Sequence, residues 1–521
     1  MKKLIGTVLC GLLMCSACCG FTGCGPKNSA NTLYIEMDNA GFGVQFIDPL
    51  IDIFEAEHEG ITVKKTFITK GSKTIIDKVL SGTSTLDLIL VESSYGLANV
   101  DRKITVDGTT YDSAFLELGD IFDAEIPGEN IALKDKLNPS YYDYQKTVVG
   151  EEEKHYIMPY LQAPVGFILN KDVYNESYGK IPNTTDEMFE MFEALPDGIT
   201  PFIDALDTSY LDDMYDVWMA QYNGMENQKK FWLGYSLQGS TAGERYVPQM
   251  FLNEGLKAAL NVWDELYDPS NGYLHPFSYT LDFTSVQNVF LEGAENILFM
   301  PCGTWLEREM DANYDPSELN IELIKTPVVS ALGTKLGITN GELSAIIDYV
   351  DGTVSELPQF DSDNGLSDDE VVAAVREARS LIGSNHDFSA MIPAYSTKTD
   401  LAKEFLQLIA SDRGIEAMLK SCGSMAPFKY DIDSSPAKSE LSDFMYSANK
   451  LIENSQYCFS YHDKLFSKGN ISLINNISYR ISTIFAAENN SRKDGDTVYL
   501  ENYTYVSEMW PTILRNAQIS V

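Results

Sequence analysis

Two tryptophans stand close to polar residues, so that flat aromatic faces are combined with hydrogen-bonding groups. Trp218 and Gln221 are three residues apart, a spacing that puts both on one face of a helix. Trp305 follows an apolar strand-like run and a Cys302-Gly303-Thr304 turn. Flat aromatic faces pack against the C–H side of a pyranose, and planar polar groups bond its hydroxyls. We expect all three side chains to contact a ligand, although a tryptophan of the hydrophobic core would have neighbours like those of Trp218.

More polar candidates lie where predicted strands end. Asp38 and Asn39 follow the strand-like run 32–37, and Glu92 and Tyr95 follow the run 86–91. We expect these four residues to reach a ligand, although Asp38 and Asn39 could instead stabilise their own turn. Glu307 and Glu309 begin a helix, where acids complement the helix dipole, and are expected at the surface.

The chain contains none of the sequence motifs that are typical of catalytic sites. The five histidines are scattered, with no pair at zinc-ligand spacing, and no G-x-S-x-G elbow or phosphate-binding loop occurs. The acidic run 361–365 resembles a calcium loop, but its glycine stands fifth and not sixth. The alternative is a solvated loop in which Ser367 caps a helix over 368–381. No catalytic residue, metal or cofactor is expected; a glycosidase needs only two carboxylates, so composition leaves that class open.

The net charge of the chain argues against partners that carry many negative charges. The 521 residues contain 76 Asp and Glu against 38 Lys and Arg, a formal net charge of −38. Nucleic acids and anionic membrane surfaces are bound through clustered cations, so neither is expected as a partner. With 44% hydrophobic and 22% charged residues, the chain can bury a substantial core.

The N-terminus has the pattern of an export signal. Lys2 and Lys3 precede an uncharged apolar run that ends in Phe21-Thr22-Gly23-Cys24. This end resembles a bacterial lipobox, which implies cleavage after residue 23 and lipidation of Cys24, with palmitate among the acyl chains. Residues 24–30 would form a tether, and the protein would sit on the outer face of the cytoplasmic membrane, held by lipid only. An uncleaved anchor and simple secretion are the alternatives. The cysteines at 302, 422 and 458 are expected as buried thiols, the alternative being one disulfide with one cysteine left over.

The first hundred residues alternate between strand and helix patterns. A strand over 32–37, a helix from Asp48-Pro49, a strand beginning at 61, a helix over 74–80 and a strand over 86–91 succeed one another. Alternation of this kind predicts a parallel α/β sheet that binds ligands at the carboxyl ends of its strands.

Several segments, in order, are similar to those of one protein family. The first comprises the opening strand, turn and helix and ends in residues 54–63. The others are the segment Tyr156-Ile157-Met158-Pro159-Tyr160 with 166–172, the run 296–305, which ends in Gly-x-Trp, and the late segment 392–428. The chain resembles a family 1 extracellular solute-binding protein, the carbohydrate receptor of an ABC importer. Trp218, Gln221 and the following tyrosine also resemble a segment of many members.

The resemblance implies a two-lobed α/β fold with several hinge crossovers and a ligand cleft between the lobes. Residues 31–163 with 387–421 would form the N-terminal lobe, and 164–386 with 422–521 the C-terminal lobe. Tyr160 and Gln162 would lie at the first crossover and reach the cleft. The protein would be a monomer that captures a sugar or oligosaccharide by closure and delivers it to permease subunits.

The chain also departs from the family pattern. Residues 341–384 form an acidic insertion, and the tail from Tyr430 onward is long. The same fold would serve a lipid-anchored ligand sensor, which is the alternative function, and a secreted glycan hydrolase is a more remote one.

Overall fold

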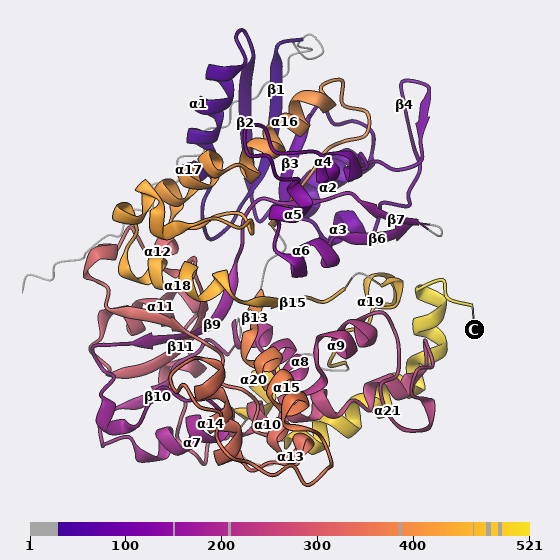
Figure 1. The fold of residues 1–521 in the computed structure, drawn as a ribbon. Helices are drawn as coiled ribbons and strands as arrows, with labels where there is room; N and C mark the ends of the chain where they lie inside the picture. Colours follow the sequence, from indigo (N-terminus) through magenta and orange to yellow (C-terminus); the bar gives the residue numbers. More distant parts are fainter. Residues whose placement is uncertain are drawn as a thin grey trace, which may run out of the picture.

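The computed structural model describes residues 30–149, 152–206, 210–384, 388–461, 463–475, 481–487 and 492–520. The predicted signal, most of the tether and Cys24 lie outside these residues. Within them, no helix combines the length and the apolar character that crossing a bilayer requires. The described chain builds two α/β lobes, one above the other in Figure 1.

The first lobe is built on a five-stranded sheet in the order β2-β1-β3-β14-β8. Both neighbours of β1 run parallel to it, as the alternating sequence pattern predicts. β14 is antiparallel to β3, because the chain enters it from the other lobe and so from the opposite direction. The strands are β1 (Thr32–Asn39), β2 (Thr62–Thr69), β3 (Leu88–Glu92), β8 (Met158–Pro159) and β14 (Phe388–Met391).

Helices and two hairpins complete this lobe. α1 begins at Asp48, with Pro49 in its first turn, and it buries Leu50 and Phe54 against the sheet. The helices are α1 (Asp48–Glu57), α2 (Ser72–Leu80), α3 (Ser94–Leu97), α4 (Gly119–Asp123), α5 (Leu133–Lys136), α6 (Pro139–Tyr144), α16 (Thr399–Ala410) and α17 (Asp412–Cys422). The hairpins pair β4 (Ile104–Val106) with β5 (Thr109–Tyr111) and β6 (Lys146–Val149) with β7 (Glu152–His155).

The second lobe has a sheet in the order β10-β11-β9-β13-β15, with β12 also paired to β9. Its central strand, β9, is buried at every position, as expected for a strand covered on both faces. The strands are β9 (Pro164–Asn170), β10 (Thr200–Phe202), β11 (Ile297–Gly303), β12 (Ile321–Ile324), β13 (Leu381–Ser384) and β15 (Gln456–Cys458).

Most of the helical mass belongs to the second lobe. Among these helices are α7 (Thr185–Ala194), α8 (Tyr215–Asn223), α9 (Met225–Trp232), α10 (Glu254–Tyr267), α11 (Phe283–Glu292), α12 (Leu306–Glu309), α13 (Ala331–Leu336), α14 (Asn340–Val350), α15 (Asp368–Ser380), α18 (Asp443–Glu453), α19 (Lys464–Gly469), α20 (Ile481–Phe485) and α21 (Gly495–Asn516). The long tail ends in α21, which runs along the edge of this lobe in Figure 1.

Several sequence predictions about packing are confirmed. Ser367 caps α15 through a reciprocal capping box with Glu370. Trp232, Trp263 and Trp510, for which no prediction is made above, are also buried in the second lobe. The three cysteines of the body, Cys302, Cys422 and Cys458, are buried and unpaired, and burial raises the pKa of the Cys422 thiol to about 12.

Candidate functional site

A cavity of about 890 Å³ lies between the two lobes. The first lobe contributes residues at the ends of β1, β2 and β3, with Phe388 of β14, and the second lobe contributes α12, Asp311 and three aromatic residues. The lining comprises Asp38, Asn39, Ala40, Gly41, Phe42, Gly43, Gln45, Thr69, Lys70, Ser72, Lys73, Glu92, Tyr210, Phe283, Trp305, Arg308, Glu309, Asp311 and Phe388. Four of the nine predicted ligand residues, namely Asp38, Asn39, Glu92 and Trp305, are brought together here.

The first wall follows from the parallel pairing of the sheet. Because β1, β2 and β3 run in one direction, their carboxyl ends meet at one edge, which faces the second lobe. Asn39 Nδ2 donates to Thr69 Oγ1 at 3.3 Å, joining the ends of β1 and β2. Glu92 ends β3 beside them and is half-buried.

Trp305 dominates the second wall. It stands two residues after β11 and directly before α12, so its indole leaves the strand end towards the first lobe. Its ring centroid is 5.3 Å from that of Tyr210 and 6.4 Å from that of Phe42, both in edge-to-face geometry. A methyl group at Gly41 would lie 2.9 Å from Trp305 Cγ, so the first lobe touches the indole. Trp305 is therefore only 2% exposed, in contact with both lobes.

Polar side chains of α12 continue the second wall. Arg308 Nη1 pairs with Asp311 Oδ2 at 2.7 Å. Glu309 Oε2 accepts from Gln287 Nε2 of α11 at 2.8 Å, and Gln287 is fully buried. The prediction of a surface position for Glu309 thus missed the cavity that it lines. Glu307 is also not a surface acid: it accepts from Ser442 Oγ, and burial raises the pKa of its carboxyl.

The cavity does not share the strong negative charge of the whole chain. Three cations line it, at Lys70, Lys73 and Arg308, against four acids, at Asp38, Glu92, Glu309 and Asp311. Two of these cations are paired, because Lys73 Nζ lies 2.6 Å from Asp77 Oδ2 and Arg308 pairs with Asp311. The balance suits a ligand without large net charge. In the described part of the chain, no three His, Cys, Asp or Glu side chains are grouped to hold a metal ion.

Trp218 and Gln221 share a helix face, as predicted, but that face packs inside the second lobe. Trp218 is fully buried and donates from Nε1 to the carbonyl oxygen of Pro327 at 3.3 Å. Gln221 Oε1 accepts from the backbone N–H of Val329 at 2.9 Å. The two side chains hold the segment after β12 and do not line the interlobe cavity.

The remaining predicted ligand residues also lie outside the cavity lining. Tyr160 is buried and stacks on Phe46 with ring centroids 6.0 Å apart. Gln162 Oε1 accepts from Tyr457 at 3.0 Å and lines a separate cavity of about 530 Å³. Tyr95 turns its hydroxyl to Asp77 Oδ1 at 2.8 Å. Each has a structural partner in this arrangement of the lobes.

Several aromatic residues of the cavity carried little signal in the sequence. Phe42 stands in the glycine-flanked turn after β1, where the turn itself was recognised. Tyr210, Phe283 and Phe388 reach the cavity from three distant segments. Only the tertiary fold unites them, so spacing along the chain could not have found them.

The structure is thus a two-lobed α/β fold with a cavity between the lobes, and comparison with known proteins agrees with this fold. Residues 49–445 match the family described as bacterial extracellular solute-binding protein. The chain belongs to this family, which is one of extracellular binding proteins and not of enzymes. No curated protein matches the sequence.

Solved structures with this fold cover almost the whole chain at low identity. RafE in complex with raffinose is 16% identical, with a TM-score of 0.55, covering 92% of this chain and 99% of its own. The sugar-binding protein MalE of Xanthomonas citri is 13% identical, with a TM-score of 0.57 and coverage of 92% and 97%. The GacH receptor of Streptomyces glaucescens, described in unliganded form and with acarbose, is 13% identical, with a TM-score of 0.55 and coverage of 92% and 98%.

Proposed function

We propose that this protein captures a carbohydrate between its lobes. The observation that carries the proposal is the composition of the cavity wall, which combines aromatic faces with planar polar groups. Trp305, Tyr210 and Phe283 supply the faces, and Asn39 and Gln45 supply amides. Proteins bind sugars through this combination because aromatic faces bury the C–H side and the planar groups fix the hydroxyls. Proteins with this fold have been solved in complex with raffinose and with acarbose, which supports the same class of ligand.

The lobes would close on the sugar and present it to the permease of an ABC importer. Residues 31–163 with 387–421 would move as one lobe, and 164–386 with 422–521 as the other. This division is supported by the two sheets, since every strand of each sheet falls within one of these sets. Closure would desolvate the ligand by rotation about a few crossover residues. A lipid on Cys24 would keep this monomeric receptor at the outer face of the membrane.

A thermal-shift screen tests the ligand class. The panel holds raffinose, acarbose and neutral mono- to tetrasaccharides, with short peptides and divalent metal salts as the comparison set. A sugar at 100 times its dissociation constant should stabilise the native state by about 2.7 kcal/mol, because only the folded cavity binds it. No shift with any glycan, together with a clear shift for a peptide or a metal, would contradict the proposal.

A further inference from the structure

Asp38 lines the cavity, but its carboxylate is engaged inside the protein. Oδ1 accepts the backbone N–H of Gly71 at 2.9 Å, and Oδ2 accepts the backbone N–H of Ser72 at 3.1 Å. Oδ2 also accepts the Ser72 hydroxyl at 2.5 Å. Asp38 as a whole residue is 5% exposed. Three of the roughly four acceptor positions of a carboxylate are thus used by one neighbouring turn.

Ser72 extends this contact to a third strand. Its Oγ donates to Asp38 and accepts the backbone N–H of Glu92 at 2.8 Å. Asp38 stands on β1, Ser72 begins α2 two residues beyond the end of β2, and Glu92 ends β3. One buried hydroxyl therefore joins the carboxyl ends of three parallel strands at the cavity wall.

The joined segment needs such support. Lys70 has a φ of 52°, a left-handed conformation that is unfavourable for a residue with a side chain. The first N–H groups of α2 have no acceptor within their own helix and carry the positive end of its dipole. The Asp38 carboxylate satisfies two N–H groups at this end through charge-assisted bonds, which are stronger than neutral ones.

We propose that Asp38 and Ser72 are positioning residues of the sugar site and not ligand contacts. They hold the backbone of Glu92 and the turn over residues 69–72, so that Glu92, Asn39 and Lys70 keep the spacing that the ligand meets. This inference rests on the proposed carbohydrate function. It assigns Asp38 a different role from the direct contact that its place at a strand end predicts.

The test is a double-mutant cycle between Ser72 and Glu92. Affinity for the panel sugar that most stabilises the wild type is measured by calorimetry for Ser72→Ala, Glu92→Ala and the double variant. Ser72→Ala should weaken binding about tenfold in the wild type but less than about threefold in the Glu92→Ala background, because it acts through Glu92. Ser72→Thr, which keeps the hydroxyl, should bind within about twofold of the wild type.

Ser411→Ala is the matched control. Ser411 is also buried in the first lobe, donates to a backbone carbonyl and accepts the N–H of Gly414, but it does not line the cavity. It should cost similar thermal stability and leave affinity unchanged in both backgrounds. Additive effects of Ser72→Ala and Glu92→Ala, or wild-type affinity of Ser72→Ala, would overturn the positioning role.

A ligand-free measurement separates this inference from the proposed function. If no sugar stabilises the wild type, the proposed function fails, and the positioning role is judged by hydrogen exchange of the Glu92 amide. That amide should exchange faster in Ser72→Ala than in the wild type or in Ser411→Ala, since its acceptor is gone. Unchanged exchange at Glu92 would overturn the inference by itself.

Discussion

Trp305 is the side chain on which both walls of the interlobe cavity converge. Its indole touches Gly303 and Tyr210 of its own lobe and Gly41 and Phe42 of the other. Part of its burial is therefore lost whenever the lobes separate. This distinguishes it from Trp218, whose burial lies wholly within the second lobe.

Replacing Trp305 should affect binding more than folding. Trp305→Ala removes the central aromatic face and should weaken sugar binding at least ~30-fold, and it should lower the unliganded melting temperature less than Trp218→Ala does, because part of the burial of the indole comes from the other lobe. Trp218→Ala is the comparison variant and should cost about 3–5 kcal/mol of unfolding free energy as a core truncation. Calorimetric titration and unliganded melting separate the two outcomes. Unchanged affinity with a much lower melting temperature would make Trp305 a packing residue.

Asp216 carries a pH dependence that belongs to folding. Burial raises the pKa of its carboxyl to about 6, with Ser460 and Gln228 as hydrogen-bond donors. The folded state then binds the proton more tightly than the unfolded state, so the unfolding free energy should fall as pH rises from about 4 to about 6. Asp216→Asn should remove this fall and raise stability at pH 7.5 by up to about 3 kcal/mol.

Urea unfolding of wild type and Asp216→Asn at pH 4, 5, 6 and 7.5 measures this dependence. Asp433 provides a control of opposite sign, because its hydrogen bonds from Lys438, Tyr446 and Lys450 lower the pKa of its carboxyl. Asp433→Asn, measured at pH 3 as well, should therefore be less stable than the wild type, and the difference in unfolding free energy should be larger at pH 7.5 than at pH 3. Parallel pH profiles for wild type and Asp216→Asn would show that Asp216 is not buried as a proton-binding acid.

Single residues show where sequence reasoning succeeds and where it stops. Asp38, Asn39 and Glu92 were found because strand ends of a parallel sheet must share an edge. Trp218 and Gln221 were placed correctly on one helix face, but periodicity does not say what that face meets. Phe388 could not be found, since β14 joins the sheet across some 300 residues of chain.

At the scale of elements, the turn between β1 and α1 is the part of the first lobe that meets the indole of Trp305. Gly41 has an ordinary φ, so an alanine there is compatible with the backbone, but its methyl group would lie 2.9 Å from Trp305 Cγ. The contact between this turn and Trp305, which follows β11, is therefore possible only because Gly41 has no side chain.

Gly41→Ala should oppose closure without damaging either lobe. Overpacking of this contact commonly costs 1–3 kcal/mol, so binding should weaken about tenfold, while the unliganded melting temperature stays near that of the wild type. Gly341→Ala is the matched control, because a methyl group on that α14 glycine meets nothing within 4 Å. Affinity by calorimetry and the radius of gyration with ligand by X-ray scattering report the effect. Wild-type affinity for Gly41→Ala would show that closure does not need this contact.

Some helices and strands could be predicted from nearby residues alone, whereas the arrangement of others depends on distant parts of the chain. The strand and helix order of the first hundred residues and the cap at Ser367 were predicted, because turn residues and apolar periodicity mark them. The antiparallel entry of β14 was not predicted, since strand direction depends on which lobe the chain comes from. The two-lobed plan came from the order of matching segments, and it is confirmed.

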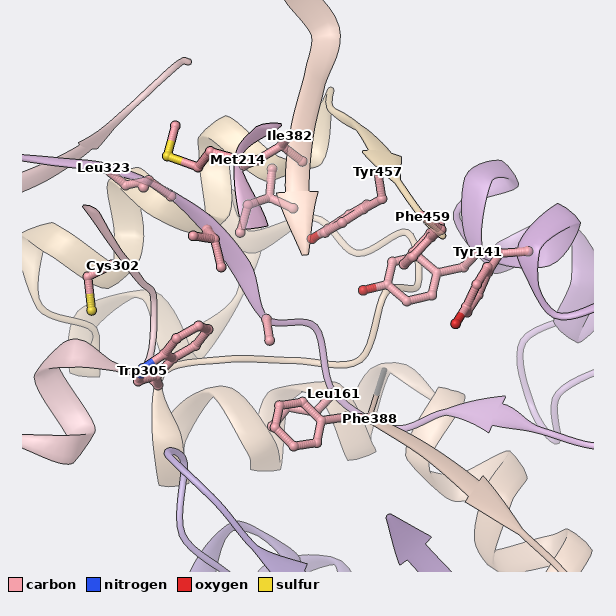
Figure 2. Close-up of a cluster of buried hydrophobic side chains, with 14 of the residues drawn as sticks. Tyr141, Leu161, Met214, Cys302, Trp305, Leu323, Ile382, Phe388, Tyr457 and Phe459 are labelled. Atoms are coloured by element: carbon pink, nitrogen blue, oxygen red, sulfur yellow. The ribbon is translucent and has the colours of Figure 1, made fainter. Parts of the chain in front are cut away.

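At the scale of the whole molecule, two of the contacts between the lobes among the described residues lie well apart from each other. One is the Trp305 contact at the cavity. The other joins α6 of the first lobe to β15 and the residues after it, where Tyr144 stacks on Phe459 with ring centroids 4.1 Å apart and Asp143 pairs with Lys229. Tyr457 of β15 also donates to Gln162 on the first crossover. Figure 2 shows Tyr141, Tyr457 and Phe459 on one side of Leu161 and Trp305 on the other.

These positions imply different behaviour when the lobes rotate. Atoms move further the more distant they are from the hinge. The α6–β15 contact, which is hydrogen-bonded to the crossover residue Gln162, should therefore persist while the Trp305 contact at the cavity opens. Phe459→Leu should accordingly lower the unfolding free energy by about 1–2 kcal/mol and leave sugar affinity within about twofold. Phe466→Leu, which changes an aromatic cluster of Phe231, Trp232 and Phe251 in the second lobe, controls for loss of a ring. Calorimetry measures the affinity, and small-angle scattering measures the size of the unliganded protein. If Phe459→Leu weakens binding more than about fivefold and expands the unliganded protein, the α6–β15 contact opens together with the cavity and does not lie at the hinge.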